Sequence, residues 1–151
     1  MEDRLKAIVK KAEAACAREE YCDYDMQQKL VKWGAERDEV ERVLDHLHEY
    51  DFLNNERYAR IYCVGKNHQL KWGRTKIAYQ LRMKRVGEEA IAQGLQEIDA
   101  DEYSESLLEL AKKKWKAIAE EDRFRKEQKL MGFLQSRGYE LNEIYNVIKK
   151  L

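Results

Sequence analysis

The chain repeats itself three times without gaps, and this periodicity constrains its fold more than any other feature. The three stretches are KLVKWGAERDEVERVLDHL, QLRMKRVGEEAIAQGLQEI and FLQSRGYELNEIYNVIKKL, which begin at Lys29, Gln80 and Phe133. Their apolar positions coincide, and two of them carry a glycine, Gly34 and Gly138, where the helical pattern breaks. The offsets of 51 and 53 residues indicate small supersecondary units that stack on their neighbours.

Each unit is predicted to contain three helices. In the second helix apolar residues recur four apart, and the helix stops where a glycine can adopt a positive φ and close the last turn. In the third helix apolar residues follow the stripe of a helix with one buried face, as at Val40, Val43, Leu44 and Leu47. The first helices are expected over Leu5–Glu19, over Glu56–Gly65 with Asn54 or Asn55 as its cap, and over about Tyr103–Ala119.

Composition agrees with a helical rod. The chain has no proline, which favours helix almost throughout, and its charged fraction of 38% exceeds the usual value of about 25%, which indicates a large solvated surface. We therefore predict an all-α protein of three tandem three-helix, helix-turn-helix-like repeats in an elongated arrangement, with units at 1–53, 54–101 and 102–151. One turn is open. Arg85 replaces the glycine, so this turn either differs in shape or tolerates a strain of about 1 kcal/mol.

Charge is segregated along a chain whose formal net charge is zero. Between Arg57 and Arg85 there are nine basic residues and no acid, whereas Val86–Glu109 holds eight acids and no base. A second basic run, AKKKWK, begins at Ala111. Like charges repel, so such a stretch becomes useful when a counter-charge approaches it from elsewhere. The other explanation is that acidic and basic segments pair with each other within the fold.

The basic stretches supply the candidate contacts to an anionic partner. Aromatic side chains, Tyr62, Trp72 and Tyr79, lie among the bases, as a stacking surface for nucleic acid requires. Core packing is favoured for them, because helical proteins bury aromatics and because Trp33, Trp72 and Trp115 occur about once per unit. The lysine run is a weaker signal, because such a run on a helix is usually a solvated face. The candidates are Arg57, Arg60, Lys66, Lys71, Trp72, Arg74, Lys76, Arg82, Lys84, Arg85, Lys112, Lys113 and Lys116.

No pattern in the sequence predicts a catalytic site, a metal site or a cofactor. His46 and His48 are two residues apart and point to different sides of a helix, so they cannot share a metal ion. No phosphate-binding glycine loop is present. Cys16, Cys22 and Cys63 form no C-x-x-C pair and are expected to be idle thiols. Without a long apolar run or a leader, we expect a cytoplasmic protein that is neither an enzyme nor membrane-bound.

Three ordered motifs resemble those of the RecX family, bacterial regulators of the recombinase RecA. EYDFLNNERYARIYCVGK and LKWGRTKIAYQLRMKRV are similar to the family's core, and KEQKLMGFLQSRGYELNEIYNVI to its C-terminal segment. The first unit fits the family's amino-terminal segment through Lys29, Leu30 and Gly34. The residues that match the three motifs are Leu53, Asn54, Arg57, Tyr58 and Ala59; Gly73, Lys76, Ile77, Leu81 and Lys84; and Lys126, Lys129, Leu130, Phe133, Leu134, Arg137, Gly138 and Tyr139. The departures are Asn55 for an acid, Gln80 for glutamate and Arg85 for glycine.

The resemblance implies a monomeric regulator that binds RecA and the RecA–DNA filament, with single- and double-stranded DNA as further partners. It implies inhibition of filament extension, ATP hydrolysis, strand exchange and coprotease activity, with the basic residues above as RecA or DNA contacts. Two alternatives stay open. The chain could bind DNA without regulating a recombinase, although its zero net charge is unusual for a dedicated DNA binder. It could also be a helical scaffold for another protein.

Overall fold

The computed structural model describes residues 2–151; Met1, the first residue of the predicted first unit, lies outside them. Those residues form nine helices and no strand, which confirms the all-α prediction. The helices are α1 (Asp3–Arg18), α2 (Asp23–Lys32), α3 (Arg37–Glu49), α4 (Asn55–Leu70), α5 (Arg74–Met83), α6 (Glu88–Gln96), α7 (Ala100–Ala117), α8 (Arg123–Ser136) and α9 (Leu141–Ile148).

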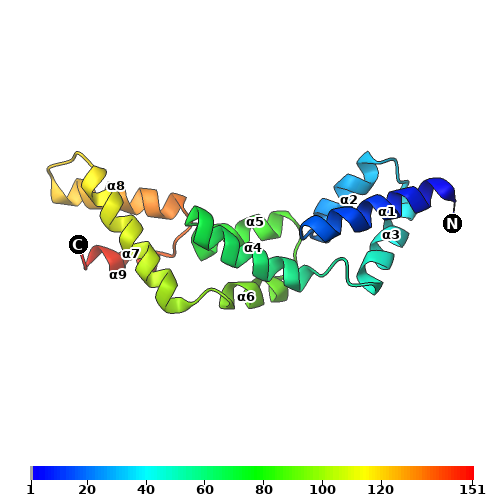
Figure 1. Ribbon diagram of the computed structural model, residues 1–151. Coiled ribbons are helices and arrows are strands. Elements are labelled where there is room, and N and C mark those ends of the chain that lie inside the picture. The colour runs from blue at the N-terminus through cyan, green and yellow to red at the C-terminus, as the bar shows by residue number, and fades with distance from the viewer. Residues whose placement is uncertain (1) are drawn as a thin grey trace.

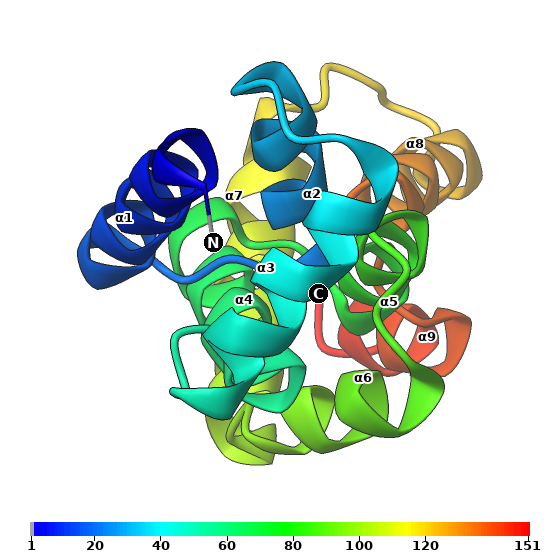
Figure 2. The same ribbon diagram turned by 90° about the vertical axis from the view of Figure 1, so that its right-hand side faces the viewer.

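The helices form three successive groups along a rod. We call α1–α3 triplet 1, α4–α6 triplet 2 and α7–α9 triplet 3. Triplet 1 lies at the end that carries the N-terminus, triplet 2 occupies the middle, and triplet 3 lies at the other end with the C-terminus (Figure 1). A view along the rod from the N-terminal end shows the triplets overlapping behind one another (Figure 2). In this elongated arrangement the middle triplet contacts the other two triplets only at its two ends (Figure 1).

The turn between the second and third helices is the same in all three triplets. Gly34 and Gly138 adopt φ values of 96° and 90°, and Arg85 adopts 60°. In each case the amide after this residue donates to the carbonyl of the leucine five positions earlier, at 2.9, 3.1 and 3.1 Å for Leu30, Leu81 and Leu134. This is the hydrogen bond of a Schellman C-cap. The open question at Arg85 is therefore answered: the turn keeps its shape, and the arginine tolerates the left-handed conformation.

Two predicted helix bounds are wrong by several residues. The helix expected over Glu56–Gly65 runs from Asn55 to Leu70, because Gly65 is accommodated inside the helix and the chain reverses only at Lys71, whose φ is 57°. Asn54 is its cap, accepting from the Arg57 amide at 2.9 Å. The first helix of triplet 3 starts at Ala100 because the Asp99 side chain caps it, accepting from the Glu102 amide.

The buried apolar side chains form two separate clusters. One lies entirely within triplet 1 and its exit, between Leu5 and Leu53. The other is shared by triplets 2 and 3 and also takes in Cys22 of the α1–α2 connection. Triplets 2 and 3 thus share one core, whereas triplet 1 has its own and reaches the second core with a single buried side chain.

Backbone contacts join triplets 2 and 3. The Gly73 amide donates to the Arg137 carbonyl at 2.7 Å, and the Thr75 amide donates to the Gly138 carbonyl at 3.0 Å. A Cβ on Gly73 would lie 2.3 Å from the Gly138 carbonyl oxygen, and a Cβ on Gly138 would lie 2.1 Å from the Lys76 Cβ. Only glycines allow the start of α5 to approach the α8–α9 turn this closely.

Candidate functional site

Two of the thirteen candidate residues tie triplet 2 to triplet 1. Arg57, near the start of α4, pairs with Glu20 at 2.8 Å and with Asp51 at 3.1 Å. The hydrogen bond that Arg57 donates to Glu20 raises the pKa of Arg57 and outweighs the effect of burial, which lowers it. Lys84, at the end of α5, pairs with Asp25 at 2.8 Å. Burial lowers the pKa of Lys84, but the hydrogen bond and charge of Asp25 outweigh it and the pKa is raised.

Arg74 is part of the joint between triplets 2 and 3. Its guanidinium pairs with Glu140 at 2.9 Å and lies over the Tyr103 ring, 3.8 Å from the centroid. The Tyr103 hydroxyl is buried, donates to Glu140 and accepts from the Arg74 amide. Burial, followed by the hydrogen bond to Glu140, raises the pKa of Tyr103, so the phenol stays protonated. Arg74 thus holds helices together at this joint and is only partly exposed.

Arg82 is exposed but paired, with Glu88 of the same triplet as its partner. Four of the twelve candidate cations therefore neutralise acids of this chain. The explanation that acidic and basic segments pair within the fold is correct for these four. Their partners at Glu20, Asp25, Asp51 and Glu140 lie in the other triplets or their connections.

The other eight cations have no carboxylate within 4 Å in the part of the chain that the structure describes. Five belong to triplet 2 and three to α7: Arg60, Lys66, Lys71, Lys76, Arg85, Lys112, Lys113 and Lys116. Arg85 lies over the Tyr24 ring of triplet 1, 5.0 Å from its centroid. No acid of this chain neutralises these eight cations.

The structure brings three of the candidates together around one aromatic side chain. We call Tyr62, Lys66, Trp72 and Lys76 the Trp72 cluster. The Lys66 ammonium lies 5.3 Å from the Tyr62 centroid and 5.4 Å from that of Trp72, and the Lys76 ammonium lies 4.7 Å from Trp72. The cluster forms because α4 ends at Lys71, which adopts the left-handed conformation, and the chain then folds back on α4. The side-chain amide of Asn67 holds this turn by donating to the backbone carbonyl of Trp72.

The core-packing interpretation of these aromatics holds in part. Tyr62 and Trp72 are half-buried and pack against the shared core, while ammonium groups lie over their rings. Cation–π contacts of this kind contribute about 0.5–1 kcal/mol at exposed sites and fix where the lysine charge sits. The cluster is therefore an ordered positive surface with aromatic edges, built where α4 meets α5.

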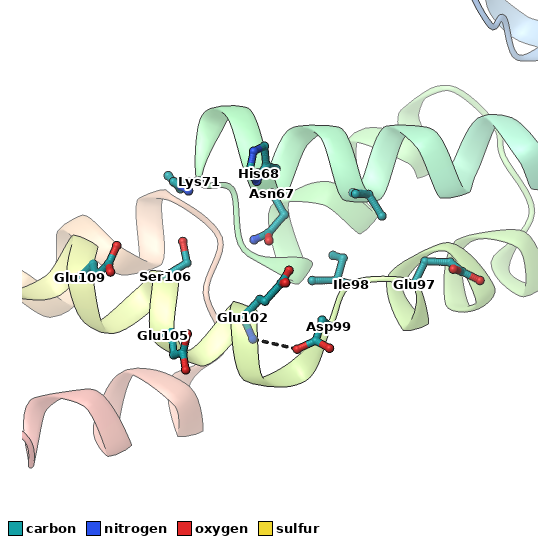
Figure 3. Close-up of a pocket in the computed structure, with 11 residues that line it drawn as sticks. Asn67, His68, Lys71, Glu97, Ile98, Asp99, Glu102, Glu105, Ser106 and Glu109 are labelled. Carbon is teal, nitrogen blue, oxygen red and sulfur yellow. Dashed lines mark hydrogen bonds between the residues drawn. The ribbon is translucent and has the colours of Figure 1, made fainter.

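An acidic cleft of about 330 Å³ lies at the junction of triplets 2 and 3. Figure 3 shows Glu102, Glu105 and Glu109 along α7, Glu97 and Asp99 before it, and His68 and Lys71 at the end of α4. Negative charge in a cleft repels phosphate groups. Among the unpaired cations, Lys71 is thus the least suited to contact nucleic acid.

Metal-ligating side chains and cysteines were the candidates for reactive chemistry in residues 2–151. No group of three or more His, Cys, Asp and Glu side chains could hold a metal ion there. Cys22 and Cys63 are buried and Cys16 is half-buried. Burial raises the pKa of Cys63 to about 12 and that of Cys16 to about 11. None of the described helices is long and apolar enough to cross a bilayer.

Several residues of these surfaces escaped sequence reasoning. Glu140 lies 66 residues from Arg74, and Asp25 lies 59 residues from Lys84. No local pattern marks such pairs. Tyr24 under Arg85, and Phe133 under Lys114 and Arg137, were likewise missed. The repeat alignment offers one signal for Phe133, since it sits one position before the buried Leu134 and must therefore lie at the edge of the core.

Comparison with known proteins bears on the whole chain. Models of the second and third three-helix domains of RecX match residues 54–95 and 101–148. Regulatory protein RecX of Clostridium botulinum (strain Eklund 17B / Type B) is 35% identical over 150 residues, which cover 95% of this chain and 69% of the relative. That of Vibrio parahaemolyticus is 32% identical over 131 residues, covering 85% and 81%.

Other relatives are longer. The match to regulatory protein RecX of Clostridium perfringens (strain 13 / Type A), 33% identical over 129 residues, covers 84% of this chain but about 60% of that relative's length. Two crystal structures, one of regulatory protein RecX and one of RecX from Lactobacillus salivarius, superpose with a TM-score of 0.88 each. They cover 99% of this chain and 74% and 97% of the solved chains, at 22% and 18% identity, and so show the fold. By sequence, the chain belongs to the RecX family of regulatory proteins, which are not enzymes.

Proposed function

We propose that this protein binds RecA and the RecA–DNA filament as a monomer in the cytoplasm and inhibits filament extension. Loss of ATP hydrolysis, strand exchange and coprotease activity follows from that inhibition. The observation that carries the proposal is membership of the RecX family over nearly the whole chain. Because the chain spans about 60% of the length of some relatives, its activity and partners are proposed and not transferred from them.

The shape and charge of the rod support this role. A filament of recombinase on DNA presents phosphates and acidic protein surface along one groove, and a rod can follow a groove over several subunits. The Trp72 cluster, Arg60 and Arg85 offer unpaired positive charge on the middle triplet, and Lys112, Lys113 and Lys116 offer it on α7. The acidic cleft between them disfavours continuous wrapping of bare DNA. We expect the unpaired cations to make the main contacts, with Arg57, Arg74 and Lys84 holding the triplets in register. Arg82 pairs within triplet 2.

ATP hydrolysis by RecA on single-stranded DNA tests the proposal. As this protein is titrated in, we expect hydrolysis to fall progressively below one protein per RecA monomer. Replacement of Lys66 and Lys76 by Ala should weaken inhibition, whereas the matched replacement of Lys6 and Lys10, two exposed lysines of α1, should not. Unchanged hydrolysis in an excess of folded protein would remove the recombinase-inhibitor role.

A second candidate function, DNA binding without recombinase regulation, is favoured by the unpaired cations of triplet 2. If about four of them met phosphates of duplex DNA, the logarithm of affinity would fall with the logarithm of salt concentration at a slope near −3.6. The sequence alone, with about six contacts, predicts a slope near −5. Such a slope on bare duplex without any effect on RecA would favour this second function. Weak binding to bare DNA with strong binding to the filament would favour the first.

A further inference from the structure

A small apolar pocket opens between α7 and α8, away from the Trp72 cluster in sequence and on a different triplet. It has a volume of about 260 Å³ and is lined by Leu110, Lys113, Lys114, Ala117, Phe133 and Arg137. An apolar cavity of about 150 Å³ accommodates a benzene molecule, so this pocket has room for one large apolar side chain. Its lining is the edge of the shared core, reached from solvent between two helices.

Positive charge surrounds this pocket. Lys113, Lys114 and Arg137 line it, and none of them has a carboxylate within 4 Å among residues 2–151. Lys112 and Lys116 continue the positive surface along α7, beside a shallow hollow that also takes in Glu109. Cations gathered round an apolar surface without counter-charge repel one another, and a partner with negative charge relieves that repulsion.

Two cations of this chain already lie over the Phe133 ring. The Lys114 ammonium lies 4.8 Å from its centroid, and the Arg137 guanidinium carbon lies 5.2 Å from it. A nucleic-acid base needs an open aromatic face on which to stack. An aliphatic side chain needs only apolar surface, which Leu110 and Ala117 supply beside the ring. The pocket therefore suits a peptide better than a base.

We propose that the pocket between α7 and α8 binds an acidic protein segment that carries an apolar side chain. The apolar side chain enters between Leu110, Ala117 and Phe133, and flanking carboxylates pair with Lys113, Lys114 and Arg137. The identity of the partner rests on the proposed function, in which the unpaired cations of α7 contact the recombinase filament. Binding of an acidic segment to the pocket requires neither RecA nor DNA, so it can be tested with this protein alone.

A labelled peptide of Asp and Glu residues with one central leucine tests the pocket, with fluorescence anisotropy as the readout and no RecA or DNA present. Replacing the leucine of the peptide by serine should weaken binding at least tenfold, equivalent to about 1.4 kcal/mol. Ala117→Phe fills the pocket and leaves every cation in place, so it should also weaken binding at least tenfold. Lys113→Glu should do the same through charge. The matched control Lys10→Glu, on exposed α1, should bind normally.

Three results would overturn the proposal, provided circular dichroism shows native helicity. The first is equal affinity for the leucine and serine peptides, which would mean general attraction between charges. The second is normal peptide binding by folded Ala117→Phe together with folded Lys113→Glu. The third is loss of binding to a single-stranded oligonucleotide in Ala117→Phe while peptide binding persists, which would assign the surface to nucleic acid. Normal peptide binding without inhibition of RecA would instead refute the proposed function and leave the pocket standing.

Discussion

Replacing Gly73 by alanine should loosen the joint between triplets 2 and 3. The φ of Gly73 is −78°, so alanine suits the backbone and the only obstacle is steric. The added Cβ would lie 2.3 Å from the Gly138 carbonyl oxygen and 2.5 Å from the Tyr139 nitrogen, and both are backbone atoms that cannot rotate away. An ordinary contact begins at 3.4 Å. The two segments must therefore separate by about 1 Å, which breaks hydrogen bonds of this geometry.

The magnitude follows from the two bonds that cross the joint, from the amides of Gly73 and Thr75. Leaving the amide of the buried Gly73 without its acceptor costs about 1–3 kcal/mol, and losing the hydrogen bond of the exposed Thr75 costs about 0.5–1.5 kcal/mol, so the pair costs about 1.5–4.5 kcal/mol. Alanine lowers the conformational entropy of the unfolded chain, which offsets this loss of stability by about 0.4–1 kcal/mol. The net loss of about 0.5–4 kcal/mol should lower the melting temperature by roughly 1–16 °C for a chain of this size.

Thermal unfolding followed by circular dichroism measures this shift, and hydrogen exchange at the Gly73 and Thr75 amides locates it. The matched control is Gly65→Ala inside α4, where an added Cβ meets no atom within 4 Å. Alanine in a helix interior is favoured over glycine by about 0.5–1 kcal/mol, so the control should melt slightly higher than the parent protein. If Gly73→Ala melted as high as Gly65→Ala and kept slow exchange at Thr75, the close approach of these backbones would not limit stability.

Three further predictions concern single side chains. Lys71→Gly should raise stability by about 1 kcal/mol, measured by urea unfolding, because glycine adopts the left-handed conformation without strain; a loss of stability would contradict this. Asp25→Asn should lower stability by up to about 1 kcal/mol at neutral pH, and less in high salt. Since the pKa of Lys84 is raised, the contribution of this ion pair should be complete below about pH 10 and disappear as pH rises through that raised pKa. An effect of Asp25→Asn that stayed constant while Lys84 lost its proton would refute the pairing. Finally, alkylation of Cys16 should be slow at pH 8, because a pKa of about 11 leaves ~0.1% thiolate, and should accelerate about tenfold per pH unit. Mass spectrometry measures the alkylation rate, and a rate independent of pH would contradict this prediction.

The internal repeat predicted most of the fold, because equivalent apolar positions must be buried in equivalent helices. Ile77, Leu81 and Leu134 are all fully buried, as their alignment requires. The end of α4 was mispredicted because Gly65 in a helix interior costs about 1 kcal/mol, less than the packing of the surrounding turns supplies. Local pattern gives no measure of that packing.

The candidate surface was predictable only in outline. The basic stretch is visible in the sequence, but the availability of each cation depends on where the acids of the other triplets come to lie. In the sequence, nothing distinguishes Arg74 and Lys84 from the other cations of the basic stretch. In the structure, Arg74 and Lys84 each neutralise an acid from another triplet, whereas Lys66 and Lys76 lie over Trp72. Helical periodicity states which faces are buried within a triplet. It carries no information about how triplets meet end to end.

The two separate cores have a consequence for synthesis of the chain. The first core draws only on residues between Leu5 and Leu53, so triplet 1 can fold as soon as that segment has left the ribosome. The core of triplet 2 shares its surface with side chains from Tyr103 to Val147 and must wait for them. At about 5–20 residues per second, the remaining third of the chain takes roughly 3–10 s to appear. During that interval the middle of the nascent protein exposes the apolar side chains that triplet 3 later covers, which makes it the segment most open to chaperones and proteases.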